Sequence, residues 1–120
     1  MTESIKQKIR EANIAFEHSQ KLNAELLAEY AQWFHENNYA EGDTIGIDGE
    51  NRIVDKIIFS INDSIYENGK HKAAIMPHLY RAYGFKLKKD GTPYKESNEL
   101  YEYKWKDAKL IKRKDQNTIN

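Results

Sequence analysis

The chain has 120 residues, a formal net charge of zero and no cysteine. This length supports one hydrophobic core and hardly a second, so we expect a single domain over residues 1–120. The lack of cysteine excludes disulfides and thiolate metal sites and favours a reducing compartment. No run approaches the roughly 18 apolar residues of a membrane-spanning helix, and residues 1–10 lack the apolar stretch of a signal peptide. We therefore expect a soluble, cytoplasmic protein without a membrane partner.

The charges are divided unevenly along the chain. Residues 1–50 carry four Lys and Arg against ten Asp and Glu, whereas residues 51–120 carry fifteen against nine. An acidic and a basic pole on one molecule influence its association with partners even when the net charge is zero. The sequence therefore predicts a charge-polarised surface.

Residues 4–38 form the predicted helical region. They contain no Gly or Pro, and Ser4 is followed three residues later by Gln7, as in a capping box. Apolar side chains recur at 4-3-4 spacing, which indicates one face of a helix. A straight helix of this length would measure about 50 Å, more than a compact domain of this size. We therefore expect either a bend near residues 18–21, giving a helical hairpin, or an N-terminal part that projects and pairs with a second copy. The apolar seam consists of Ile5, Ile9, Ala12, Phe16, Leu26, Tyr30 and Trp33.

Residues 43–111 form the predicted sheet-rich region. Asp48-Gly49 lies between two β-branched segments, and Asn68-Gly69 lies between two more. Both dipeptides tolerate the positive φ angles of tight hairpin turns. A further turn is expected at residues 90–93, with strands from Phe85 to Lys89 and from Leu100 to Trp105, and residues 112–120 are expected to form a flexible tail.

Two segments fit more than one secondary structure. Residues 53–68 alternate apolar and polar side chains but also fit helical spacing, and their β-branched, Asn and Ser content favours a strand. Residues 73–85 fit equally an edge strand and a short helix that begins at Pro77. The expected fold class is α+β, with the long N-terminal helix or helical hairpin packed on a small, mostly antiparallel sheet of about four strands. The alternative is a mostly α protein with a winged C-terminal hairpin.

A basic surface is predicted in the C-terminal half. In a strand from Leu100 to Lys106, the aromatic side chains fall on one face and the lysines on the other. The aromatic face then suits the core, and the lysine face is free to contact phosphates of a nucleic acid. The candidate contact residues are Lys86, Lys88, Lys89, Lys104 and Lys106.

An acidic surface is predicted on and after the helix. It either forms a solvated face that balances the basic half within the fold, or it binds a basic partner. The candidate residues are Glu25, Glu29, Glu36, Glu41 and Asp43.

Signals for catalysis are few. The four histidines lack the spacing of metal ligands, and no nucleotide-binding motif is present. Asp90 with Glu102 and Lys104 has the Asp and Glu-x-Lys pattern of metal-dependent nucleases. With nineteen acidic residues and fifteen lysines, however, about two acid-x-Lys triplets are expected by chance. We predict no catalytic residue, no metal site and no cofactor.

The leading functional hypothesis is a small, non-catalytic accessory protein that acts by protein–protein docking through its charge-polarised surface. One alternative is a nucleic-acid-binding protein that contacts phosphates through its basic C-terminal half. A second alternative is a metal-dependent nuclease. The expected partners are thus a protein, a nucleic acid, or a second copy bound through the N-terminal helix.

Overall fold

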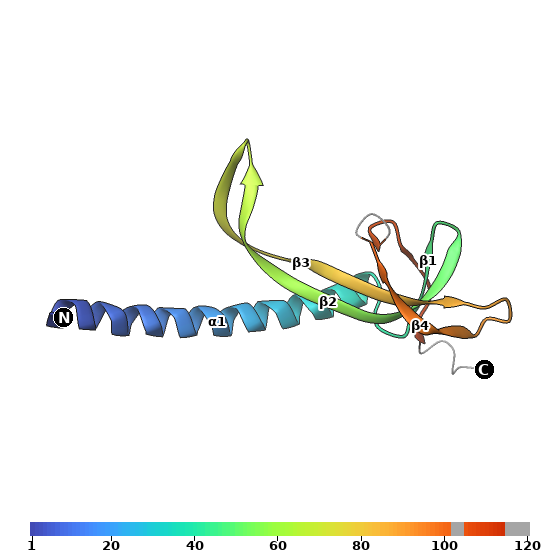
Figure 1. The fold of residues 1–120 in the computed structure, drawn as a ribbon, viewed down its shortest axis with the longest axis horizontal. Helices are drawn as coiled ribbons and strands as arrows, with labels where there is room; N and C mark the ends of the chain where they lie inside the picture. The colour runs from blue at the N-terminus through green and yellow to red at the C-terminus, as the bar shows by residue number, and fades with distance from the viewer. Residues whose placement is uncertain (102–104, 115–120) are drawn as a thin grey trace.

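One antiparallel sheet and one long helix make up residues 1–101 and 105–114, the part of the chain that the computed structural model describes. The five strands are ordered β4-β3-β2-β1-β5. The α+β prediction is therefore confirmed, with five strands where about four were expected. No helix in this part of the chain is long and apolar enough to cross a membrane. The elements are α1 (Glu3–Asn37), β1 (Thr44–Ile47), β2 (Glu50–Glu67), β3 (Lys70–Leu87), β4 (Pro93–Leu100) and β5 (Lys109–Lys112) (Figure 1).

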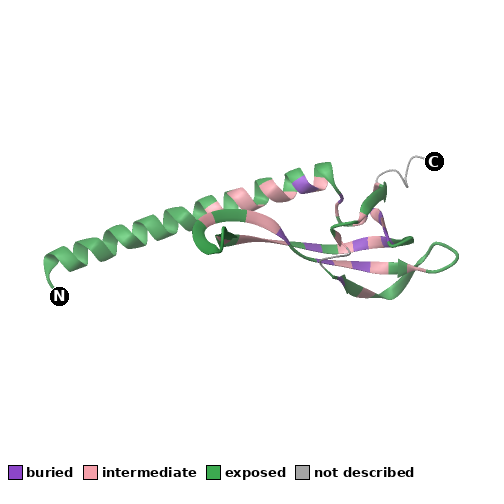
Figure 2. Ribbon diagram, turned by 90° about the horizontal axis from the view of Figure 1, so that it is seen from above, coloured by how far each residue is buried: buried purple, intermediate pink, exposed green. Residues whose placement is uncertain are grey.

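The helix α1 is continuous over 35 residues. It begins after Thr2, whose hydroxyl accepts a hydrogen bond from the Ile5 amide at 3.2 Å, so the cap is Thr2 rather than Ser4. The predicted bend near residues 18–21 is wrong, because the chain continues straight and its N-terminal part projects beyond the sheet (Figures 1 and 2). Only the C-terminal part of α1 lies along the sheet.

The strands β2 and β3 form a long hairpin of 18 residues each that curves away from α1 (Figure 1). Its turn has positive φ at Asn68 (51°) and Gly69 (79°), and the β1–β2 turn repeats this at Asp48 (50°) and Gly49 (80°), as type I′ turns require. Both predicted hairpins are confirmed.

The ambiguous segments are both strands. Residues 53–68 lie in β2 up to Glu67, as predicted. Residues 73–85 lie in β3, where Pro77 pairs with Ile61 and does not begin a helix. At this point β3 is an edge strand, since β4 pairs only with Ala82 and the residues after it. An edge strand tolerates the missing N–H of proline.

The C-terminal third differs from its prediction. The strand β4 begins at Pro93 and ends at Leu100, so the predicted strand from Leu100 to Trp105 is wrong in its described part, and residues 102–104 lie outside the described residues. The chain then returns as β5, which pairs with β1. Arg113 and Lys114, in the predicted flexible tail, are bound to the fold through Asp43.

The core lies where the sheet meets the C-terminal part of α1. All of α1 is described, and Phe34 is its one buried residue. The Phe34 ring contacts Phe59 at 5.3 Å and Tyr39 at 5.2 Å between centroids, and Tyr30 meets Phe59 edge-on at 5.7 Å. Trp33, a member of the predicted apolar seam, is 52% exposed. The buried hydrophobic residues of this core are Phe34, Tyr39, Ile45, Ile47, Val54, Ile57, Leu79, Ala82 and Leu100.

Candidate functional site

The β3–β4 turn lies at the end of the sheet farthest from the N-terminus (Figure 1), and a basic groove lies around this turn. It comprises three adjoining cavities of about 550, 600 and 310 Å³, all of which Lys86 lines. We use the name basic groove for these cavities and their cationic and aromatic lining. The lining residues in question are Arg52, Lys86, Lys88, Lys89, Tyr94 and Lys95.

Arg52 is the buried member of the basic groove. Its side chain is 8% exposed, and its Nη2 lies 3.5 Å from the exposed Glu50 carboxylate. Its Nε has no hydrogen-bond partner among the described residues. In the β2–β3 register Arg52 lies directly opposite Lys86, so two cations face each other across the strands, an unfavourable arrangement that the exposed Glu50 carboxylate offsets only at Nη2. A buried guanidinium with an unpaired N–H favours an anionic ligand.

Carboxylates border the basic groove without filling it. Glu50, Glu96 and Glu99 each line one of the three cavities, and Glu99 lies 3.8 Å from Arg81. Lys88 lies over the Tyr94 ring, 5.7 Å from its centroid, as in a cation–π contact. The groove is therefore positive overall but interrupted at its rim.

Three of the five predicted basic residues come together in this groove: Lys86, Lys88 and Lys89. Lys106 lies over the Trp105 ring at 5.9 Å and lines none of the three cavities, and Lys104 lies outside the described residues. Sequence reasoning missed Arg52, Tyr94 and Lys95. The hairpin pattern points to a β2–β3 pairing, but the residue opposite Lys86 depends on bulges that the pattern does not reveal.

The nuclease pattern is only partly placed by the structure. Asp90 lies in the β3–β4 turn, where its Oδ1 accepts hydrogen bonds from the Thr92 hydroxyl at 2.6 Å and the Thr92 amide at 2.9 Å. These bonds lower the pKa of Asp90. Glu102 and Lys104 lie outside the described residues. Among the residues that are described, no group of three His, Asp or Glu side chains is placed to hold a metal ion.

Asp43 is a structural residue, which corrects its assignment to an acidic partner surface. It is 3% exposed. Its carboxylate accepts hydrogen bonds from the Ala40 amide, the Lys114 amide and Arg113 Nη1. Arg113 in turn donates to the carbonyls of His35 and Glu36. The pair thus joins the C-terminal end of α1 to the segment after β5, and Asp43 is not accessible to a partner.

The other four predicted acidic residues are exposed. Glu25 and Glu29 line a cavity of about 500 Å³ between one flank of α1, residues 15–29, and Ile75 of β3. We call this cavity the notch. Glu36 accepts a hydrogen bond from Gln32, and Glu41 accepts one from the Ile57 amide at 3.4 Å. The structure therefore brings Glu25 and Glu29 together beside an apolar side chain.

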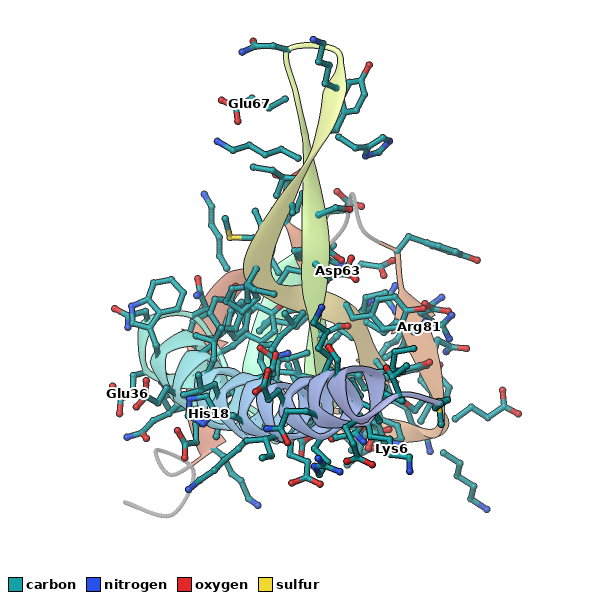
Figure 3. All side chains as sticks on the ribbon, turned by 90° about the vertical axis from the view of Figure 1, so that its left-hand side faces the viewer. Lys6, His18, Glu36, Asp63, Glu67 and Arg81 are labelled. Carbon is teal, nitrogen blue, oxygen red and sulfur yellow. The ribbon has the colours of Figure 1, made fainter. Side chains whose placement is uncertain are left out.

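The N-terminal part of α1 is exposed along its whole length, and its last turns, from Ala15 to Leu22, line the notch beside Ile75. Residues 3–22, which we call the arm, are all exposed, and Phe16 is 61% exposed. Seen along the helix, Lys6 and His18 lie on α1 while Asp63 and Glu67 lie on the hairpin that rises away from it (Figure 3). The molecule measures 71 Å along its longest axis, with a radius of gyration of 20.2 Å. A compact chain of this length has about 14 Å.

The exposed apolar residues of the arm lie mainly on one side. At about 100° per residue, Ile5, Ile9 and Phe16 fall within about 20° of the direction of Phe34. The stripe that contacts the sheet at Phe34 thus continues along the arm without a sheet to cover it. Ile14 lies about 160° away, on the opposite side.

Comparison with known proteins identifies no relative. The chain matches no protein-family model, no curated protein and no solved structure.

Proposed function

We propose that this chain is a non-catalytic binding protein that acts by docking onto a protein partner, with the arm as its docking element. The observation that supports this function is the apolar stripe of Ile5, Ile9 and Phe16, which continues from the core-facing side of α1 but is left exposed by the described residues. In proteins, tertiary packing of an apolar face supplies most of the stability of a helix. The arm therefore gains its stability from a partner surface.

The charges add specificity to this docking. The tip of the arm carries Lys6, Lys8 and Arg10 against Glu3, whereas Glu25 and Glu29 flank the notch. The basic groove lies at the other end of the molecule. Charge patterns of this kind direct association and set orientation more than they raise affinity.

In-cell photo-crosslinking tests this function. A photo-activated residue replaces Asn13, which lies beside the apolar stripe, and three chains are compared: the parent, Phe16→Glu and Ile14→Glu. We expect discrete covalent adducts with the parent, their loss with Phe16→Glu, and their retention with Ile14→Glu, because Ile14 points away from the stripe. Adducts that survive Phe16→Glu, or their absence from the parent, would contradict docking through the arm.

A second candidate function is binding of a polyanion such as a nucleic acid in the basic groove. The specific observation in its favour is the buried Arg52, which lies opposite Lys86 in the β2–β3 register and whose Nε has no hydrogen-bond partner among the described residues. Affinity for a single-stranded oligonucleotide should then fall steeply with salt, and Lys86→Ala should reduce the slope of log K against log salt by about 1. Lys72→Ala, near the hairpin tip, is the matched control with no effect. Absence of binding at low salt would exclude this function.

A further inference from the structure

We propose that the partner of the arm is a second copy of this chain, and that the two arms pair antiparallel so that each tip enters the notch of the other molecule. This inference rests on the proposed function and names the occupant of the same surface. It is carried by three features: the seam along the arm, the apolar lining of the notch, and the opposite charges of tip and notch.

The seam along the arm has the repeat of a left-handed coiled coil. Positions Ile5, Ile9, Ala12, Phe16 and then Ser19, Asn23 and Leu26 follow strict 4-3 spacing, an average of 3.5 residues. On a straight helix such a seam rotates by about 20° per heptad. At the tip of the arm the seam therefore points in the same direction as Phe34. Toward residue 26 it has turned to the flank of α1 that lines the notch. A second helix that follows the seam is guided into the notch and away from the sheet.

The notch offers an apolar surface to this helix. Leu22 is 50% exposed and Ile75 is 49% exposed, and both line the cavity together with Leu26. In an antiparallel pair centred between residues 17 and 18, Ile9 faces Leu26 of the second copy. The contact is reciprocal, so each Ile9 is covered and each notch is filled.

The rest of the seam fits the same register. Ala12 faces Asn23 of the second copy, which places a small residue opposite a polar one. Phe16 faces Ser19 of the second copy in the same way. Because Phe16 and Asn23 each face a small side chain, the two helices can approach closely in the middle of the overlap.

The charges favour this orientation over a parallel one. Lys8 directly precedes Ile9 and Glu29 directly precedes Tyr30, so both occupy g positions of the heptad. In an antiparallel pair the g positions of the two helices lie side by side. Each Lys8 therefore lies beside Glu29 of the second copy, twice by symmetry. Neither side chain has another ion pair among the described residues. In a parallel pair Lys8 would lie beside Asn13 instead.

The pair is a closed dimer. The same surface is used by both molecules, so the contact is isologous and leaves no unpaired arm that could add a third copy. Both sheets lie at opposite ends of the helical pair, and both basic grooves stay accessible.

Charge reversal tests the pairing on the purified, full-length chain. Sedimentation equilibrium should show a monomer–dimer equilibrium whose dissociation constant rises about tenfold for Lys8→Glu and likewise for Glu29→Lys. The double variant Lys8→Glu/Glu29→Lys should recover most of the parental affinity, since both pairs are restored with opposite sign. Lys21→Glu, on the outer face of the helix, is the matched control without effect. Two single effects that simply add in the double variant would overturn the pairing of Lys8 with Glu29.

Cysteine cross-linking tests the orientation, and the chain has no cysteine of its own to complicate it. Ala12→Cys and Asn23→Cys chains are mixed and oxidised. We expect a disulfide-linked dimer from the mixture and none from Ala12→Cys alone. A dimer from Ala12→Cys alone would indicate a parallel pair and overturn the inference.

The outcomes separate this inference from the proposed function. A parent chain that stays monomeric up to about 1 mM overturns the second copy as partner. Docking through the arm would then still be supported by photo-adducts in cells whose mass differs from that of a dimer of this chain and which are lost with Phe16→Glu. If neither the dimer nor the photo-adducts are found, both the pairing of two copies and docking through the arm are overturned.

Discussion

Replacing Phe34 by Ala should release α1 from the sheet, because Phe34 is the one buried residue of this helix. It makes edge-on contacts with Tyr39 and Phe59 and a tilted contact with Tyr30. Truncation of a buried Phe costs about 3–5 kcal/mol. Since Phe34 lies at the border of the core, we expect the lower value, about 3 kcal/mol, or a melting temperature lower by about 12 °C.

The matched control is Trp33→Ala, one residue away on the same helix. Trp33 is 52% exposed and its ring contacts Tyr30 at 5.6 Å, so its truncation should cost about 1 kcal/mol. Urea unfolding followed by circular dichroism, at one fixed protein concentration, measures both changes. Equal losses for the two variants would refute the assignment of Phe34 as the anchor of the helix.

Three further predictions concern the sheet and its surroundings. Asp43→Ala should lower the free energy of unfolding by about 3 kcal/mol, because it removes the buried carboxylate that accepts hydrogen bonds from the Ala40 amide, the Lys114 amide and Arg113, whereas the exposed Asp48→Ala should change it by less than about 0.5 kcal/mol; equal effects in urea unfolding would contradict this. Tyr39→Phe should raise the free energy of unfolding by about 1 kcal/mol, since the buried hydroxyl has no hydrogen-bond partner among the described residues, and a loss of stability would show that the hydroxyl is satisfied. Burial raises the pKa of Tyr39 from 10.0 to about 12. The neutral form of Tyr39 therefore contributes to the free energy of unfolding below pH 10, and this contribution should be lost as the pH rises to about 12. The fall in the free energy of unfolding over this pH range should be smaller in Tyr39→Phe.

The two tight turns could be predicted because their chemistry is local. Asp48-Gly49 and Asn68-Gly69 adopt positive φ at both positions, which few other dipeptides tolerate. The projecting helix was also among the predicted alternatives, since its length exceeds a compact domain. These features depend on a few neighbouring residues or on chain length alone.

The register of the long hairpin could not be predicted. Counting back from the turn pair Glu67–Lys70 without irregularities would place Arg52 opposite Phe85, on the other face from Lys86. Three register shifts in β2–β3 combine to a displacement of one residue, and Arg52 faces Lys86 instead. A bulge has no reliable sequence signal, and one residue moves a side chain to the opposite face. The buried cation of the basic groove is therefore visible only in the structure.

The anchor of the helix and the last strand were missed for different reasons. A strict 4-3 seam ends at Trp33, but an unsupercoiled helix rotates away from that seam over four heptads, which brings Phe34 to the sheet. The strand β5 is held through Arg113 and Asp43, which are 70 residues apart. Nothing in the polar sequence near Arg113 indicates that distant partner.

Hydrogen exchange of the arm over a series of protein concentrations tests most directly the claim that a second copy covers it. Protection of the amides in residues 3–22 should rise with concentration, with a midpoint at the dissociation constant from sedimentation, while core amides such as that of Val54 exchange slowly throughout. Fast exchange of the arm at every concentration would contradict the claim.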